Sequence, residues 1–180
     1  MPRYYRRRRT VVRAPKKKWA SQIKMFTMSI TGWNETLGGG VQELVGNSAS
    51  TSNPTPVLIK AGNFKVQGDW IYQPATAGMG GRATARMFIM YCPEGTVPTT
   101  ATQVQSLVNS HPEWIMAWKQ LEANTDTETY DQDRFSFSSR LKRNLNSGDK
   151  IICAYILERN STVNVNIDFH MTAQYWTCAN

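Results

Sequence analysis

Cysteine and histidine are scarce in this 180-residue sequence, which contains three cysteines and two histidines. The cysteines, Cys92, Cys153 and Cys178, are odd in number and widely spaced, which argues against a disulfide framework and favours a reducing compartment. No two potential metal ligands have the short spacing of a zinc site. No local signature pairs His111 or His170 with a nucleophile, although folding could still bring a histidine and a cysteine together. These absences predict no catalytic residues, no metal and no cofactor, and a protein that is not an enzyme.

Long apolar runs are also missing. No window contains the roughly 18–20 uninterrupted apolar residues of a membrane-spanning helix, and no apolar segment follows the N-terminal charges as it would in a signal peptide. The glycine-rich segment 78–85 lacks the Gly-Lys-Ser/Thr ending of a phosphate-binding loop, which argues against nucleotide hydrolysis. The apolar fraction of 41% is typical of folded proteins. We therefore expect one folded domain with its own core and no membrane insertion.

Acidic residues are absent from the start of the chain, where Glu35 is the first. Nine of the first eighteen residues are basic, namely Arg3, Arg6, Arg7, Arg8, Arg9, Arg13, Lys16, Lys17 and Lys18. Like charges this close repel one another, and almost no apolar surface is present to offset the entropy of ordering. We therefore expect this stretch to be a disordered, flexible arm.

The natural partner of such an arm is a dense polyanion, because each lysine or arginine near a phosphate releases a condensed counterion. Arginine suits phosphate especially well, since its planar guanidinium can bind two oxygens at once. Tyr4, Tyr5 and Trp19 flank the basic run and could stack on bases, at roughly 1–3 kcal/mol per base. These three aromatic residues and the nine basic ones form the predicted nucleic-acid-binding set. The other interpretations are a localisation tag or an anionic-membrane patch, and a nuclear localisation signal is compatible with nucleic-acid binding.

Charge divides the chain into two parts. The whole chain has 21 basic and 13 acidic residues, and residues 1–24 hold ten basic residues and no acidic one. Residues 25–180 therefore hold 11 basic and 13 acidic residues, a net charge of −2. We accordingly predict a basic N-terminal arm over residues 1–24 and a nearly neutral folded domain over residues 25–180.

Short apolar or alternating segments predict a mostly β domain. The predicted strands are residues 25–31, 57–60, 64–72, 86–92, 135–141, 150–157 and 163–171. Apolar residues at helical spacing predict one helix over residues 101–109, with Thr99 or Thr100 as its cap. The polar, glycine-rich stretch 32–56 is predicted to be a long loop. Six to eight strands with polar loops and one helix are typical of an antiparallel sandwich or jelly roll.

Three sequence features follow one another in a specific order. The arginine-rich arm leads directly into strands. Residues 88–95 (FIMYCPEG) are followed, after a helix, by residues 111–114 (HPEW), and residues 134–145 (RFSFSSRLKRNL) are followed by Ser-Gly-Asp at 147–149 before an apolar strand. Through these features, which together extend over about the first 155 residues, the chain resembles the capsid proteins of circovirus-like viruses. These are small circular single-stranded DNA viruses that encode a replication initiator (Rep).

This resemblance implies a single eight-stranded antiparallel jelly roll with a short helix in a loop. It implies that sixty copies build a T=1 icosahedral shell whose arms lie inside on circular single-stranded DNA. Such a protein is found in the virion, and in the host nucleus during assembly. Its partners would be further copies of itself, the DNA or other encapsidated nucleic acid, a nuclear import receptor and a cell-surface receptor.

Trp114 and Trp118 lie in a compact aromatic segment. Tryptophan is enriched at the hot spots of protein interfaces, so both residues are candidate anchors for contacts between copies. The alternative is that both are core residues.

Two functions of other classes remain open. A nucleic-acid-binding β-sandwich that works as a monomer or small oligomer would use the same arm in a salt-dependent way. A cationic, sugar-binding sandwich would instead place acidic and aromatic loop residues in a ligand pocket.

Overall fold

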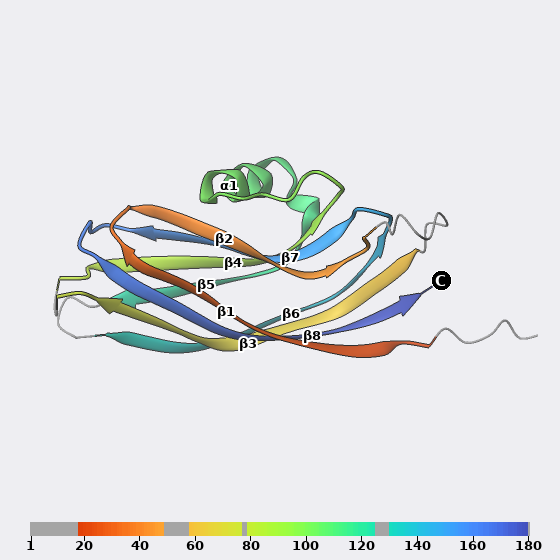
Figure 1. The fold of residues 1–180 in the computed structure, drawn as a ribbon, viewed down its shortest axis with the longest axis horizontal. Helices are drawn as coiled ribbons and strands as arrows, with labels where there is room; N and C mark the ends of the chain where they lie inside the picture. Colours follow the sequence, from red (N-terminus) through yellow and green to blue (C-terminus); the bar gives the residue numbers. More distant parts are fainter. Residues whose placement is uncertain (1–17, 49–57, 77–78, 125–129, 180) are drawn as a thin grey trace, which may run out of the picture.

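The computed structural model describes residues 18–48, 58–76, 79–124 and 130–179. Eight strands and two helical segments lie within these ranges (Figure 1). In chain order they are β1 (Ala20–Trp33), β2 (Leu37–Gly46), β3 (Ile59–Pro74), β4 (Arg82–Cys92), α1 (Ala101–Ser110), the 3-10 helix η1 (Pro112–Trp114), β5 (Ile115–Asn124), β6 (Asp131–Leu145), β7 (Lys150–Arg159) and β8 (Val165–Ala179).

The strands form two four-stranded antiparallel sheets, with the orders β1-β8-β3-β6 and β2-β7-β4-β5. The first strand pairs with the last, the second with the seventh, the third with the sixth and the fourth with the fifth. This pairing arises when one long antiparallel hairpin, four strands against four, rolls up into two packed sheets, which is the jelly roll. The predicted all-β, eight-stranded jelly roll with a short helix in a loop is thus confirmed.

The core lies between the two sheets and is built from alternate side chains along each strand. In β8, the fully buried Val165, Ile167 and Phe169 alternate with positions such as Asn166 and His170, which are exposed. This is the strand whose strict alternation was the clearest in the sequence. The structure extends it beyond the predicted range, to Ala179.

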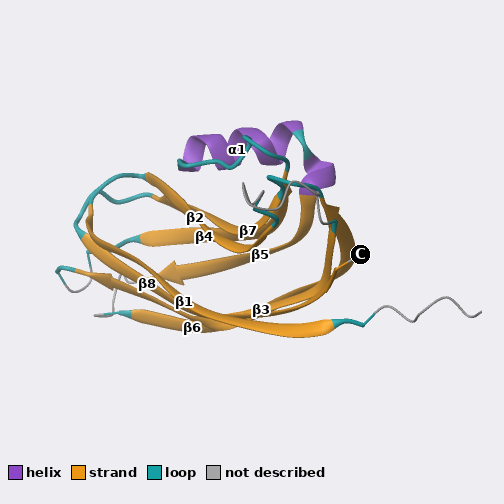
Figure 2. Cartoon of the chain, turned by 45° about the vertical axis from the view of Figure 1, so that its right-hand side comes forward, coloured by secondary structure: helices purple, strands orange, loops and turns teal. Residues whose placement is uncertain are grey.

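Helix α1 covers the outer face of the β2-β7-β4-β5 sheet (Figures 1 and 2). It begins after Thr100, whose Oγ1 accepts a hydrogen bond from the Gln103 backbone N–H at 3.3 Å. Val104 is completely buried against apolar residues of β4 and β7. This cover explains why those two strands are apolar on both faces. No helix in the described part of the chain is long and apolar enough to cross a membrane.

Strand β2 lies inside the stretch 32–56, so the prediction of one long loop there is wrong. Three consecutive glycines, residues 38–40, hid the strand because glycine is normally unfavourable in strand interiors. In β2, however, close packing leaves no room for a side chain larger than that of glycine. A Cβ at Gly39 would lie 2.8 Å from the Cβ of Ala101, at the start of helix α1.

Two other boundaries differ from the predicted ones. Strand β1 begins at Ala20, inside the segment assigned to the arm, and the division of the chain after residue 24 stays a prediction. The predicted strands 57–60 and 64–72 belong to one strand, β3. A bulge at Asn63, which has a positive φ of 54°, separates the two parts and explains why the alternation changes phase there.

A buried arginine ties two loops together at one end of the sandwich. Arg159 is 7% exposed, and its guanidinium donates to the backbone oxygens of Trp33, Glu35 and Val163 at 2.9, 2.8 and 2.6 Å. The guanidinium carbon also lies 4.7 Å from the centre of the Trp33 ring. These contacts join the β1–β2 connection to the β7–β8 connection. In the described part of the chain, carbonyl dipoles and an aromatic ring balance this charge, and no carboxylate forms an ion pair with it.

Candidate functional site

Most of the predicted nucleic-acid-binding residues lie outside the residues that the structure describes. They are Arg3, Tyr4, Tyr5, Arg6, Arg7, Arg8, Arg9, Arg13, Lys16 and Lys17. The structure places the other two members of the set, Lys18 and Trp19, immediately before β1. Lys18 is exposed and Trp19 is half-buried. These two residues mark where the basic segment joins the sandwich.

Trp19 is held at this junction by a lysine from β6. The Lys142 ammonium lies 5.2 Å from the centre of the Trp19 ring, at the distance of a cation–π contact. Such a contact contributes about 0.5–1 kcal/mol at an exposed site. Sequence spacing could not predict this contact, because Lys142 is far from Trp19 along the sequence. The Lys142 ammonium, which belongs to the folded domain, therefore lies next to Trp19, the residue that follows the basic run.

Trp118 is one of the most exposed large apolar residues among those described, at 60%. It lies on β5, which is the edge strand of its sheet. Beside it, a hollow of about 340 Å³ opens between helix α1 and strands β4 and β5. Apolar side chains in its lining include Phe88, Val108, Ile115 and Ile156. Trp118 thus fits the interface interpretation, because a core residue would be enclosed.

Asp149 joins two turns at the opposite end of the sandwich from Arg159. Its buried carboxylate accepts hydrogen bonds from the Tyr91 hydroxyl at 2.8 Å, the Asn146 backbone N–H at 2.9 Å and the Glu94 backbone N–H at 3.3 Å. Burial, followed by the hydrogen bond and charge of Asp149, raises the pKa of Tyr91 to about 12. The turn after β4 is thereby fixed to the turn between β6 and β7. The two sequence motifs that contain Tyr91 and Asp149 form one structural unit.

Trp114, the other candidate anchor, packs onto the same unit. Its ring meets the Tyr91 ring edge-on, with the centroids 6.5 Å apart, and stacks on the His111 imidazole at 4.0 Å with an interplanar angle of 7°. Trp114 is half-buried. The two tryptophans therefore differ: Trp114 is fixed by intramolecular stacking, whereas Trp118 is largely exposed, and the role of either as an interface anchor stays a prediction.

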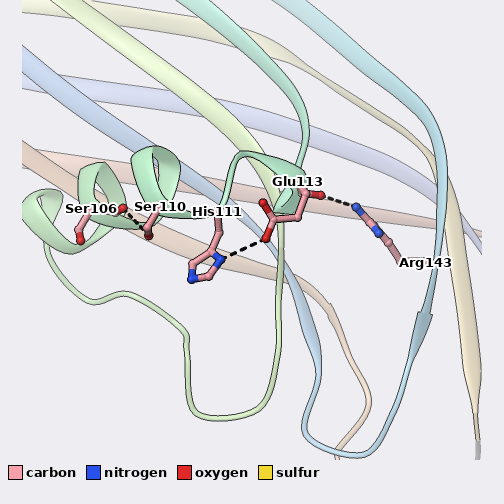
Figure 3. Close-up of polar contacts among 5 residues, drawn as sticks. All are labelled: Ser106, Ser110, His111, Glu113 and Arg143. Atoms are coloured by element: carbon pink, nitrogen blue, oxygen red, sulfur yellow. Dashed lines mark hydrogen bonds and ion pairs between the residues drawn. The ribbon is translucent and has the colours of Figure 1, made fainter.

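Arg143 connects β6 to the segment between α1 and β5 (Figure 3). Its Nη2 donates to the backbone oxygen of Glu113, while the Glu113 carboxylate lies 3.1 Å from the Nδ1 of His111. The Glu113 backbone N–H and His111 lower the pKa of that carboxyl group. The last turn of α1 is closed by Ser110, whose Oγ donates to the Ser106 backbone oxygen at 2.8 Å. These contacts fix the point where the helix ends and β5 begins.

The three cysteines are buried, and Cys92 and Cys153 are free thiols. Burial raises the pKa of Cys92 to about 11 and that of Cys153 to about 12. A thiol has to ionise before it can attack a substrate, so these two thiols are poor nucleophiles near neutral pH.

We expect the free energy of unfolding to be steady up to about pH 9 and to fall between about pH 9 and 12. Folding raises the pKa of Cys153 from 9.0 to about 12 and that of Tyr91 from 10.0 to about 12. Below pH 9 both states hold these protons, and above it the unfolded state ionises first and gains stability. Urea unfolding at a series of pH values measures the decline. Cys153→Ala should make the decline shallower, and a flat profile to pH 11 would contradict the prediction.

Comparisons with known proteins gave no family assignment. No protein-family model and no curated protein matches the chain. Among solved structures, the chain is similar to Desmodium yellow mottle tymovirus (9% identity, 89% of this chain and 88% of that chain, TM-score 0.35) and to turnip yellow mosaic virus (7% identity, 88% and 93%, TM-score 0.33). It is also similar to dimeric latent PorU from Porphyromonas gingivalis (10% identity, 93% and 13%, TM-score 0.39). These identities and TM-scores are too low to assign a family or a function. The fold rests on the strand order itself, which makes the chain an eight-stranded jelly-roll β-sandwich.

Proposed function

We propose that the chain is the capsid protein of a circovirus-like, Rep-encoding single-stranded DNA virus. In this proposal sixty copies assemble into a T=1 icosahedral shell that packages the circular DNA through the basic arm. The observation that carries the proposal is the separation of charge on a jelly roll: ten basic and no acidic residues up to residue 24, and a net charge of −2 after it. Such a domain can form a shell while the arm supplies positive charge that partly neutralises the nucleic acid. The role is structural, not catalytic, and the protein is located in the virion.

The charge of the arms suits partial neutralisation of a small genome. Sixty arms with nine basic residues each would carry about 540 positive charges, against one negative charge per nucleotide in roughly two thousand nucleotides. Because these contacts are to phosphates, packaging should show no strong sequence preference. The same basic run could serve as a nuclear localisation signal, which would place the protein in the host nucleus during assembly.

Negative-stain electron microscopy of the purified full-length protein, with its absorbance ratio at 260 and 280 nm, tests the proposal. The expected result is uniform spherical particles of about 20 nm with a raised ratio, because the arms retain nucleic acid. Small irregular species under every assembly condition tried would contradict the shell. The protein would then be a nucleic-acid-binding module that works as a monomer or small oligomer.

We expect Trp118→Ala to raise the protein concentration needed for particle formation by about tenfold or more. A tryptophan at the centre of an interface contributes about 2 kcal/mol or more, and each subunit would lose this contribution. The fold should be unaffected, because Trp118 is 60% exposed. Light scattering across a concentration series measures the threshold.

Tyr130→Ala is the matched control, because Tyr130 is an aromatic residue with a similar exposure of 52%. Its removal should leave the threshold close to that of the wild type. If the Trp118 variant assembles at the wild-type concentration, Trp118 is not an anchor and the contacts between copies lie elsewhere.

A further inference from the structure

The outer face of the β1-β8-β3-β6 sheet is open, in contrast to the outer face of the other sheet. Helix α1 lies on the β2-β7-β4-β5 sheet, and no described helix lies on the opposite face of the sandwich (Figures 1 and 2). The exposed positions of the open face are mostly polar, with the apolar Ile23 and Met25 among them on β1, and pairing sets the exposed residues in rows across the strands. One row joins Thr27 of β1, His170 of β8, Asp69 of β3 and Arg134 of β6.

Charge on this face is uneven. Four strand segments form the end where β1 begins, namely residues 20–25, 60–67, 136–143 and 172–178. None of them contains an acidic residue. Their exposed cations are Lys65, Arg140 and Lys142, and none of the three belongs to an ion pair in the described part of the chain. The carboxylates of the face, Asp69 and Asp168, lie towards the other end.

The basic strip formed by Lys65, Arg140 and Lys142 continues from the base of the arm. Lys142 contacts Trp19, the residue that follows the basic run, through the cation–π pair. Lys65 lies on the neighbouring strand, β3, next to β6. A polyanion bound to the arm therefore meets unpaired positive charge as soon as it reaches the sandwich.

Beyond the strip, a hollow of about 620 Å³ opens on the same face around Gly68. A side chain could not be accommodated at Gly68, because a Cβ there would lie 2.0 Å from the His170 backbone oxygen. Groups around the hollow include the amide of Gln67, the imidazole of His170 and the thioether of Met25, which is 79% exposed. Amides and hydroxyls can bond to the edges of any base, and an imidazole ring can stack on it.

We propose that single-stranded nucleic acid crosses this face after leaving the arm, with phosphates on the basic strip and one base in the hollow against His170 and Met25. Charge determines which side of the hollow the phosphates occupy and which side the base occupies. On the far side of the hollow Asp69 lies opposite Arg134, so the two charges there offset each other, whereas Lys65 and Arg140 have no such carboxylate among the described residues. The phosphates therefore lie towards Lys65 and the base towards His170. The inference rests on the proposed function for the identity of the polyanion. It also gives the orientation of the subunit, with this sheet facing the nucleic acid and helix α1 facing away.

Binding of full-length protein to a fluorescein-labelled thirty-nucleotide poly-thymidine, measured over a salt series below the assembly threshold, tests the strip. In Lys65→Gln/Arg140→Gln, the slope of log affinity against log salt should become shallower by about 1.4, because each lost phosphate contact removes about 0.7. The matched control is Arg82→Gln/Lys119→Gln, which removes one exposed arginine and one exposed lysine from the other sheet. The control should keep the wild-type slope. Equal slopes in the two double variants would contradict the proposal that phosphates bind the basic strip.

Ultraviolet crosslinking of the same oligonucleotide, followed by mass spectrometry, tests the hollow. Crosslinked peptides are expected from β1 around Met25 and from β8 around His170. Crosslinks confined to residues 1–18 would contradict the proposal that a base binds in the hollow, while leaving the proposed function intact. A chain lacking residues 1–18 that binds the oligonucleotide as tightly as the full chain would instead overturn the packaging role of the arm.

Discussion

Removing residues 1–18 is expected to bring the nucleic-acid content of the purified protein close to zero while the jelly roll stays folded. The deletion removes nine positive charges and leaves a domain with a small net negative charge. A chain that loses nine positive charges loses most of the counterion release that drives binding to phosphates, so it should bind nucleic acid far more weakly at moderate salt. The deleted residues precede β1, so the strand pairing found in the described part of the chain is kept. The absorbance ratio at 260 and 280 nm measures the content, and circular dichroism reports the fold.

A rearranged arm is the control for this deletion. Shuffling residues 2–18 while keeping their composition leaves the charge unchanged, and phosphate contacts carry no sequence information. The shuffled protein should retain wild-type nucleic-acid content. Equal content in the deleted and full-length proteins would show that the arm does not package nucleic acid.

Replacing the buried arginine has the largest expected effect on stability. Arg159→Met should lower the free energy of unfolding by about 3–5 kcal/mol, because three carbonyl groups lose their donor at once and each costs about 1–3 kcal/mol when left unsatisfied. Methionine keeps much of the volume, so the loss reports hydrogen bonding more than a cavity. Urea unfolding followed by tryptophan fluorescence measures the change.

Arg86→Met serves as the comparison for Arg159→Met. Arg86 forms a salt bridge with Glu158 at 2.8 Å, and both side chains are 37% exposed. Solvent screens such a pair, so its loss should cost about 1 kcal/mol or less. If the two arginine variants lose similar stability, the two loops do not depend on Arg159.

Elements with a strong local pattern could be predicted from the sequence. Strict alternation located β8, and apolar spacing located α1 with Thr99 or Thr100 as its cap, of which the structure uses Thr100. The apolar runs 86–92 and 150–157 are the central strands β4 and β7. In each case neighbouring residues carry the signal, because the period of the side chains is itself local.

Other features depend on residues far apart in the chain and could not be predicted. The glycines of β2 are required because Ala101 and Tyr155 occupy the space that larger side chains would fill. Since glycine is unfavourable in strands, the same residues weaken the strand pattern in the sequence. The contacts between Tyr91 and Asp149 and between Trp19 and Lys142 require the register of complete sheets. The motifs that carry the family resemblance could be recognised in the sequence. The hydrogen bonds through which Asp149 joins two of them could not be predicted. The roles of the arm residues stay predictions.

The position of β8 has a consequence for how the protein is made. β8 lies between β1 and β3, so the first of the eight described strands pairs with the one that is synthesised last among them. While residues 165–179 are still being synthesised, β1 has no partner strand and its sheet has a gap at the centre. Pairing between distant segments is slow, and an unpaired strand edge is prone to wrong associations. Completion of this sheet therefore has to follow the synthesis of residues 165–179, and a nascent chain carries the basic segment well before it carries a finished domain.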